Sequence, residues 1–240
     1  MIRKFISNIG YDVQVRNRDF AAALGKVVKD GDIFLDAGCG DLIIGSYIDC
    51  GKVIGVDIQE PRPDFERSEF ASGSILALPF DDQAFPFTGS LDVIEHLPLE
   101  LRKVAIRELV RTSKAGVFVG FPFAGEPERL DRSFYEELTG RSREIPEWLD
   151  EHLRQSYPVL TEIKDILRTA FAERGDDVQF SVSFSENLTI TKVLRRAAVM
   201  SGKAYVLANT FFGLTLPVHP KSRNEKNSYR AIIFVRVRGN

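Results

Sequence analysis

Cysteine, tryptophan and long apolar runs are scarce in this chain of 240 residues, which has two cysteines and one tryptophan. Cys39 and Cys50 have neither the number nor the spacing of a disulfide scaffold or a metal site, so we expect two reduced thiols in a cytoplasmic protein. No run reaches the ~18 apolar residues that cross a bilayer. Residues 1–7 also lack the long apolar core and the cleavage site of a signal peptide.

An excess of charge of one sign is also missing. The 32 lysines and arginines nearly balance the 34 aspartates and glutamates, which leaves a formal net charge of −2. Without a global basic field, nucleic acid is not an expected partner. The length suits one domain, or one domain with an insertion, and is ample for a sizeable core.

The most informative segment runs from Ile33 to Gly40 and reads Ile-Phe-Leu-Asp-Ala-Gly-Cys-Gly. A short apolar run bounded by turn residues predicts a buried strand of a parallel sheet, and glycines directly after it allow a sharp turn and a close approach to a ligand. Nineteen residues past Gly38, the run 53–56 ends at Asp57. That spacing suits a carboxylate that binds ribose hydroxyls from the tip of the neighbouring strand. The two elements together predict an adenosine-containing cofactor.

The glycine turn differs from the dinucleotide fingerprint G-x-G-x-x-G, because Gly45 is not at the place of the third glycine. Asp41 also puts negative charge where a pyrophosphate would lie, which is unfavourable. A cofactor without phosphate fits better. The segment 33–40 resembles motif I of the class I S-adenosylmethionine-dependent methyltransferases, whose usual form is hydrophobic-Leu-Asp-x-Gly-Cys-Gly.

Three further segments follow in the order typical of one branch of that family. They are Gly-Ser-Ile-Leu-Ala-Leu-Pro-Phe at 73–80, Asp-Asp-Gln-Ala-Phe at 81–85 and Ser-Leu-Asp-Val-Ile-Glu-His-Leu-Pro at 90–98. They resemble the small-molecule methyltransferases that include quinone-biosynthesis enzymes, in which an "ALPF" loop precedes the fourth strand and an "EH" pair follows it. The resemblance implies S-adenosylmethionine as the cofactor.

Alternating patterns along the chain predict an α/β fold with a doubly wound, Rossmann-like sheet and helices on both faces. By the same resemblance the sheet is seven-stranded and mostly parallel, with its last strand antiparallel. We expect strands near 32–37, 52–57, 67–72, 86–93, 116–122, 177–184 and 229–237. We expect helices near 16–29, 42–50, 99–113 and 160–173. In the helix at 99–113 the inward side chains should be Leu101, Val104, Ala105, Leu109 and Val110.

We expect a single methyltransferase domain over 1–240 with two departures from the alternation. Residues 124–160 carry prolines, many charges and Trp148, and we interpret them as an insertion on the acceptor side, over the strand ends. Residues 187–218 are apolar and flanked by basic residues. A helix packed on the sheet is the favoured interpretation, and contact with a membrane interface or a homodimer surface are the alternatives.

The resemblance assigns cofactor roles to two groups of residues. In the first group, Asp36 and Gly38 border the methionine part and Gly40 gives backbone access to it. Asp57 binds the ribose hydroxyls, and Ile58 covers one face of the adenine.

In the second group, Ser74 stands where family members usually have an aspartate for the adenine amino group, and the backbone of Ile75 is the other candidate partner. Leu91 would lie under the sulfonium. Two positions depart from the family pattern. Leu42 replaces the common third glycine of motif I, and Pro86 replaces an aspartate and removes a ladder donor, so the fourth strand should start late.

The chemistry needs little beyond positioning, because the sulfonium already carries an activated methyl group. A hydroxyl acceptor further needs a base, and His96, just after the fourth strand, has an unperturbed pKa of about 6.5. The alternative is that Glu95 and His96 cap the next helix or bond each other. Asp92-x-x-Glu95-His96 also resembles the E-x-x-E-H metal ligands of some quinone and RNA methyltransferases. With aspartate in the first place and no second histidine nearby, we expect no metal.

The acceptor is suggested only by a looser resemblance. Residues 146–153 and 228–230 resemble methyltransferases of bacterial surface-polysaccharide and other glycan pathways, so we expect methylation of a hydroxyl on a small-molecule or glycan acceptor. A quinone- or polyketide-type methyltransferase and a non-catalytic cofactor-fold binding module are the alternatives. Trp148, His152 and Tyr157 could form an aromatic acceptor wall, or could pack the insertion.

Overall fold

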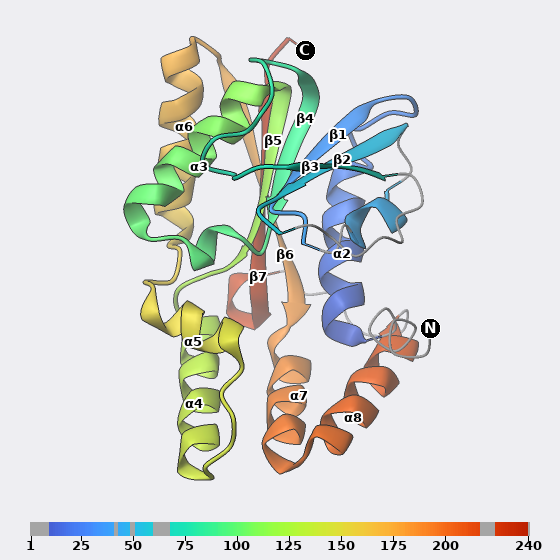
Figure 1. The fold of residues 1–240 in the computed structure, drawn as a ribbon, viewed down its shortest axis with the longest axis vertical. Coiled ribbons are helices and arrows are strands. Elements are labelled where there is room, and N and C mark those ends of the chain that lie inside the picture. Colours follow the sequence, from blue (N-terminus) through green and yellow to red (C-terminus); the bar gives the residue numbers. More distant parts are fainter. Residues whose placement is uncertain (1–9, 41–42, 49–50, 60–67, 217–223, 240) are drawn as a thin grey trace.

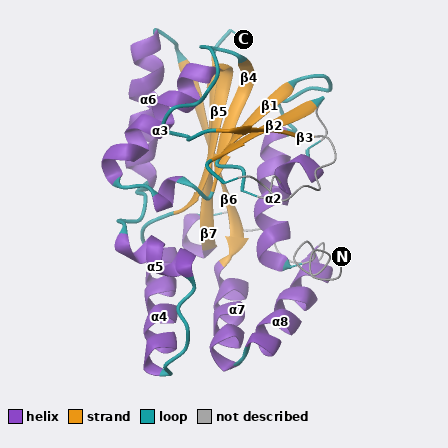
Figure 2. Cartoon of the chain, in the orientation of Figure 1, coloured by secondary structure: helices purple, strands orange, loops and turns teal. Residues whose placement is uncertain are grey.

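The computed structural model describes residues 10–40, 43–48, 51–59, 68–216 and 224–239. Seven strands form one sheet in the order β3-β2-β1-β4-β5-β7-β6 (Figures 1 and 2). The first five strands pair in parallel, and β7 lies antiparallel between β5 and β6. This arrangement confirms the predicted fold class. The strands are β1 Ile33–Ala37, β2 Lys52–Asp57, β3 Ser68–Ser72, β4 Phe85–Leu91, β5 Ser113–Pro122, β6 Val178–Asn187 and β7 Ser228–Val237.

Helices cover both faces of the sheet (Figure 1). Helices α3 (Leu99–Thr112) and α6 (Leu160–Arg174) lie on one face, and α2 (Tyr11–Leu24) lies on the other. Each face has its own apolar core: Ile106, Leu167 and Phe171 belong to the first, and Phe20 and Phe118 to the second. The helix predicted at 42–50 is only a short 3-10 helix, Ile43–Ser46, in the described part of the chain.

The inward face of α3 differs from the prediction. Leu101 and Val104 are exposed, and Arg102 is fully buried. The guanidinium of Arg102 donates from Nε to the carbonyl oxygens of Ile94 at 2.9 Å and Leu97 at 3.0 Å. Apolarity alone favoured the two wrong residues. The helical period places the arginine inward, where carbonyl groups accept from Nε and Nη2, whereas Nη1 has no partner among the described residues.

The prediction that β4 starts late was also wrong. The strand begins at Phe85, and its register with β5 shifts between Phe85 and Phe87. The irregularity leaves Pro86 out of the ladder, so the missing N–H breaks no pairing.

Four helices lie beyond the carboxyl edge of the parallel strands (Figure 1). They are α4 Glu126–Gly140, α5 Glu147–Arg154, α7 Leu188–Met200 and α8 Gly202–Leu214. Asn187 caps α7 by accepting from the N–H groups of Thr189 and Ile190, and Ser201 caps α8 by accepting from Ala204. Helix α7 packs on α4 and α8, and α8 packs on α2.

Residues 187–218, described as far as residue 216, therefore form a helical hairpin. The favoured interpretation places this segment on the sheet, but the hairpin packs mainly on other helices: Ile190, Leu194 and Val199 are buried, and α7 packs on α4 and α8. The apolar outer side of α8 is exposed. None of the helices in the described part is both long and apolar enough to span a bilayer.

Candidate cofactor and acceptor site

The turn after β1 contains two glycines, and the structure requires a glycine at each for a different reason. Gly38 has φ +76°, and a Cβ there would lie 2.3 Å from Cγ2 of Val93. Gly40 has φ +50°, and a Cβ there would meet no atom of the described residues within 4 Å. Both backbone angles favour glycine, but only Gly38 is closely packed. The space beside Gly40 is open on the side where a side chain would lie, which leaves room for a ligand.

Asp57, at the end of β2, joins this turn to the neighbouring strand. Its Oδ2 accepts from the N–H of Gly40 at 2.9 Å, and its Oδ1 accepts from the N–H of Gln59 at 3.0 Å. A carboxylate has about four lone-pair sites, so each oxygen keeps acceptor capacity for a hydroxyl donor. The predicted ribose-binding carboxylate is thus held in place by the backbone.

A cavity of about 750 Å³ opens beside these residues, within the usual range for small-molecule sites. It brings together six of the eight predicted cofactor residues and the predicted catalytic residue: Gly38, Gly40, Asp57, Ile58, Ser74, Ile75 and His96. The Ser74 hydroxyl accepts from the N–H of Leu76 at 3.2 Å, and the side chain of Ile58 is exposed.

The other two predicted residues, Asp36 and Leu91, line a smaller cavity of about 200 Å³. It adjoins the first cavity, since Gly38 and Gly40 line both. Asp36 is only 5% exposed, and burial, followed by the nearby charge of Asp57, raises its pKa to about 7. A cation bound next to Asp36 would favour its ionised form.

A third cavity, of about 260 Å³, is lined in part by helices α5, α7 and α8. Its lining is largely polar and comes from far apart in the sequence: Asp12, Arg16, Asp92, Glu95, His96, Trp148, His152, Glu186, Thr191, Leu194, Arg195, Tyr205, Tyr229 and Arg230. Asp92 and His96 also line the 750 Å³ cavity. We call this third cavity the acceptor cavity and the 750 Å³ cavity the cofactor cavity. Asp92 and His96 lie at their junction.

Buried charges hold the floor of the acceptor cavity. Arg230 of β7 donates from Nη2 to Asp92 Oδ2 at 2.8 Å and from Nη1 to Glu186. Arg16 Nη1 donates to the same Asp92 oxygen at 3.2 Å. Burial raises the pKa of Asp92, but the two guanidinium groups outweigh it and hold that pKa below its ordinary value. The sequence analysis missed Arg230, although a charge at the start of an otherwise apolar strand was a visible signal.

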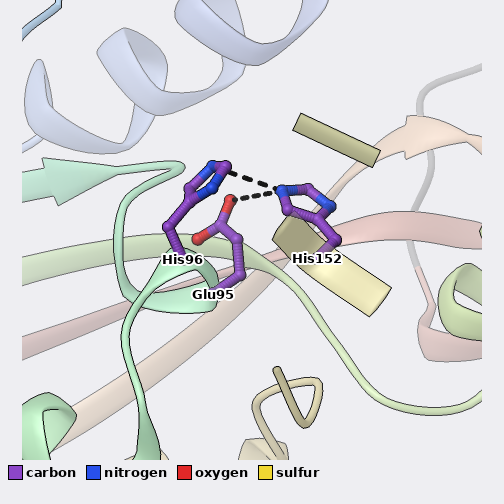
Figure 3. A group of neighbouring side chains, drawn as sticks. All are labelled: Glu95, His96 and His152. Carbon is purple, nitrogen blue, oxygen red and sulfur yellow. Dashed lines mark hydrogen bonds and ion pairs between the residues drawn. The ribbon is translucent and has the colours of Figure 1, made fainter. Parts of the chain in front are cut away.

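His96 is held in place by a carboxylate of helix α5. Its Nδ1 lies 2.7 Å from Glu151 Oε2, and an ionised carboxylate only accepts, so Nδ1 carries the proton and Nε2 keeps its lone pair. That Nε2 lies 3.3 Å from Nε2 of His152 (Figure 3). Burial, followed by the charge of His152, lowers the pKa of His96.

Glu95 lies beside the two histidines (Figure 3). It is 2% exposed, and neither carboxylate oxygen has a hydrogen-bond partner among the described residues. Ligand atoms of Glu95, His96 and His152 lie within 4.8 Å of one another, so these three residues could hold a divalent cation. Nothing in the sequence indicated that His152 lies next to His96, because His152 follows it by 56 residues and belongs to α5. The expectation of no metal stays a prediction.

The aromatic wall considered from the sequence is present in part. Trp148 and His152 line the acceptor cavity. Tyr157 does not: it is buried, and its hydroxyl donates to Asp131 Oδ2 at 2.7 Å. Tyr229, which lines the acceptor cavity, donates to the same oxygen, so Asp131 anchors one tyrosine in the cavity lining and one behind it.

The chain is similar to known methyltransferases. The family described as a methyltransferase domain matches residues 35–121. A methyltransferase of Thermotoga maritima, titled S-adenosylmethionine-dependent, superposes with a TM-score of 0.56 at 16% identity, covering 93% of this chain and 89% of that one. Over residues 35–121 the chain therefore carries a methyltransferase domain. No curated protein matches the chain.

Two further structures share the fold of this methyltransferase. The Haloferax volcanii complex with the Trm112 methyltransferase activator matches with a TM-score of 0.54 at 16% identity, covering 95% of this chain and 92% of that one. The cyclase SpnF matches with a TM-score of 0.52 at 17% identity, covering 92% and 79%. Because one fold hosts different reactions, the acceptor has to be argued from the site.

A methyltransferase domain implies S-adenosylmethionine as the cofactor, and the residues present fit it. Gly40 has no described atom where a side chain would lie, Asp57 keeps acceptor capacity for a diol, and the 750 Å³ cavity spans both. Asp36 lies in the adjoining cavity. It is buried and forms no salt bridge with a described residue, so a positive charge bound beside it would be favourable.

Proposed function

We propose that this methyltransferase moves the methyl group of S-adenosylmethionine to a hydroxyl oxygen of a small-molecule or glycan acceptor, with His96 as the base. The observation that carries the proposal is the place of His96, which lines both the cofactor cavity and the acceptor cavity. A base at that junction can reach an acceptor hydroxyl next to the methyl donor.

The bound cofactor supplies an activated methyl group. Glu151 keeps the proton on Nδ1 of His96, so Nε2 bears the lone pair, which in this structure faces Nε2 of His152 at 3.3 Å. As the new carbon–oxygen bond forms and the methyl–sulfur bond breaks, the hydroxyl proton passes to Nε2. The low pKa of His96 keeps the imidazole neutral at neutral pH, so the base is ready before the acceptor binds.

The acceptor cavity favours a polar acceptor over a quinone or polyketide. Its lining combines three guanidinium groups, four carboxylates, two phenols and one indole. Such a lining offers donors and acceptors to hydroxyl groups, and the indole of Trp148 can pack against a sugar ring. A flat apolar ring would find little apolar surface there.

The cap segment 124–160 serves the acceptor in this proposal. It contributes Trp148 and His152 to the acceptor cavity, and to the cofactor cavity it contributes Glu151. The backbone that would carry the cofactor, at 38–40, 57–58 and 73–75, belongs to the sheet and its loops. The cofactor roles of Asp36, Gly38, Gly40, Asp57, Ile58, Ser74, Ile75 and Leu91 are part of the same proposal.

A pair of variants tests it, after a pooled acceptor screen has found a substrate by release of S-adenosylhomocysteine. We expect His96→Ala to lower turnover about 10²–10⁴-fold with cofactor affinity little changed. We expect Asp57→Ala to weaken cofactor binding by about 1.5–3 kcal/mol, because charged hydrogen bonds are lost. The wild-type rate should rise with pH through a limb below the ordinary histidine pKa, and His96→Ala should lack that limb.

Each result can go against the proposal separately. A His96→Ala variant with near-full activity and an unchanged pH profile leaves His96 a structural role. If calorimetry finds no S-adenosylmethionine binding at all, methyl transfer itself is wrong. If the cofactor binds but no hydroxyl acceptor turns over, a non-catalytic binding module becomes the better interpretation.

A further inference from the structure

The outer side of the α7–α8 hairpin is apolar and exposed. On α8, Leu207 is 72% exposed, Phe211 60% and Leu214 67%. These positions follow the helical spacing i, i+4 and i+7, so they form one stripe along the helix. Met200, at the end of α7, is 71% exposed. A soluble monomer has little reason to align large apolar side chains in water, so the stripe points to a partner surface.

The α7–α8 hairpin itself carries charges of one sign only. Residues 188–214 contain four basic residues and no acidic residue, in a chain whose formal net charge is −2. Three of the four, Lys192, Arg196 and Lys203, are exposed. Lys203 lies one turn before Leu207 on the same side of α8, which puts a cation in line with the apolar stripe. The surface therefore suits a partner that is apolar inside and negatively charged at its boundary.

The inner side of the hairpin packs on the domain, so the exposed stripe is not needed to hold the hairpin in place. Buried Ile190 and Leu194 pack with Tyr11 and Val15 of α2, so the hairpin is already anchored to the domain. Tyr205 of α8 points inward: its hydroxyl donates to Asp12 Oδ2 at 2.8 Å, and it lines the acceptor cavity. Two sides of one helix thus carry the exposed stripe and a wall of the acceptor cavity.

We propose that the α7–α8 hairpin binds the surface of an anionic lipid bilayer, with Met200, Leu207, Phe211 and Leu214 in the interface and the lysines among the headgroups. Apolar burial and attraction to anionic lipid together give such helices their affinity. A chain bound in this way holds its acceptor cavity next to the membrane. The proposal does not depend on methyl transfer, because lipid binding is measured without any acceptor.

Co-sedimentation with vesicles tests the proposal on the full chain. We expect binding to vesicles of phosphatidylcholine and phosphatidylglycerol in equal parts, weaker binding to pure phosphatidylcholine, and a fall in binding as salt rises. Leu207→Glu with Phe211→Glu should weaken binding by about tenfold or more for each side chain. Lys192→Gln with Lys203→Gln should weaken it about fivefold for each lysine, and only on the anionic vesicles.

Matched controls use exposed residues of the same kind elsewhere. Leu101→Glu with Val104→Glu changes two exposed apolar residues of α3 and should leave vesicle binding unchanged. Circular dichroism and S-adenosylmethionine calorimetry show whether each variant is folded. Wild-type protein that stays in solution with both vesicles overturns the proposal, and so does binding that survives the Leu207 and Phe211 changes. Self-association that these changes abolish, without vesicle binding, assigns the stripe to a second copy and also overturns it.

Discussion

Replacing Asp36 by asparagine should remove most of the pH dependence of cofactor binding. Asp36 is buried, and its pKa is raised to about 7 by burial and by Asp57. At about pH 6, roughly nine in ten molecules therefore carry a proton on this carboxyl. If the cationic cofactor binds best beside the ionised form, binding at that pH must first release the proton.

The magnitude follows from the pKa. Between about pH 6 and pH 8, wild-type affinity should rise about tenfold, or about 1.4 kcal/mol, and then level off. Asp36→Asn should bind more weakly than wild type at the upper pH and should show little of that slope. The sulfonium does not titrate, so the difference between the two proteins isolates Asp36.

Stability supplies a second measurement with its own sign. The pKa of Asp36 is higher in the folded chain than the ordinary value of 3.8 for an aspartate, so the folded state binds the proton more tightly. The ionised carboxyl therefore destabilises the fold, increasingly as pH rises from about 4 to about 7, by up to about 4 kcal/mol. Asp36→Asn should be more stable than wild type above neutral pH and should converge with it in acid.

Calorimetry at three pH values, in buffers of different ionisation enthalpy, measures affinity and proton release together. His96 lines the same cavity, so His96→Ala is run in parallel to subtract its titration. Wild-type affinity without a pH slope, or an Asp36→Asn variant with the wild-type slope, would refute the reasoning.

Three other expected outcomes test the cap and the buried charges. Trp148→Ala should lower kcat/KM at least about tenfold with little change in cofactor affinity in calorimetry; equal loss of both would show that the insertion is structural. Chelators should leave turnover unchanged, whereas Zn²⁺ should inhibit it by binding at the paired imidazoles, and His152→Ala should relieve that inhibition; loss of activity on chelation contradicts a metal-free base. Arg230→Met should lower the free energy of unfolding by about 3–5 kcal/mol in urea titrations, because Asp92 and Glu186 lose their buried partner; a variant within 1 kcal/mol of wild type would contradict this.

The sheet could be predicted from the sequence because each strand carries a local signal. The predicted strands near 32–37 and 52–57 are short, mostly apolar and bounded by turn residues, and the observed strands run over 33–37 and 52–57. The cofactor residues follow directly from the strands, since carboxyl ends of parallel strands meet at one edge. Local pattern and site position therefore carry the same information in this half of the molecule.

The acceptor cavity could not be predicted in the same way, because its parts come from different elements. His152 reaches His96 only through the placement of α5, and Arg230 reaches Asp92 from a strand 138 residues away. No period or spacing in the sequence records these contacts. The exposed side of α8 was also unpredictable, because an apolar helix looks the same in sequence whether its second side is covered or not.

One contact links the predictable half to the unpredictable half. Val93 occupies the space that a Cβ at Gly38 would need, so the cofactor turn and the segment after β4 are packed directly on each other. Asp92, with φ +58°, turns the chain at the end of β4 and places Val93 there. Glu95 and His96 follow within the next three residues. The glycine that resembles a cofactor-binding residue thus also supports the position of His96, the proposed base. We expect any side chain at position 38 to displace Val93 and shift His96 with it.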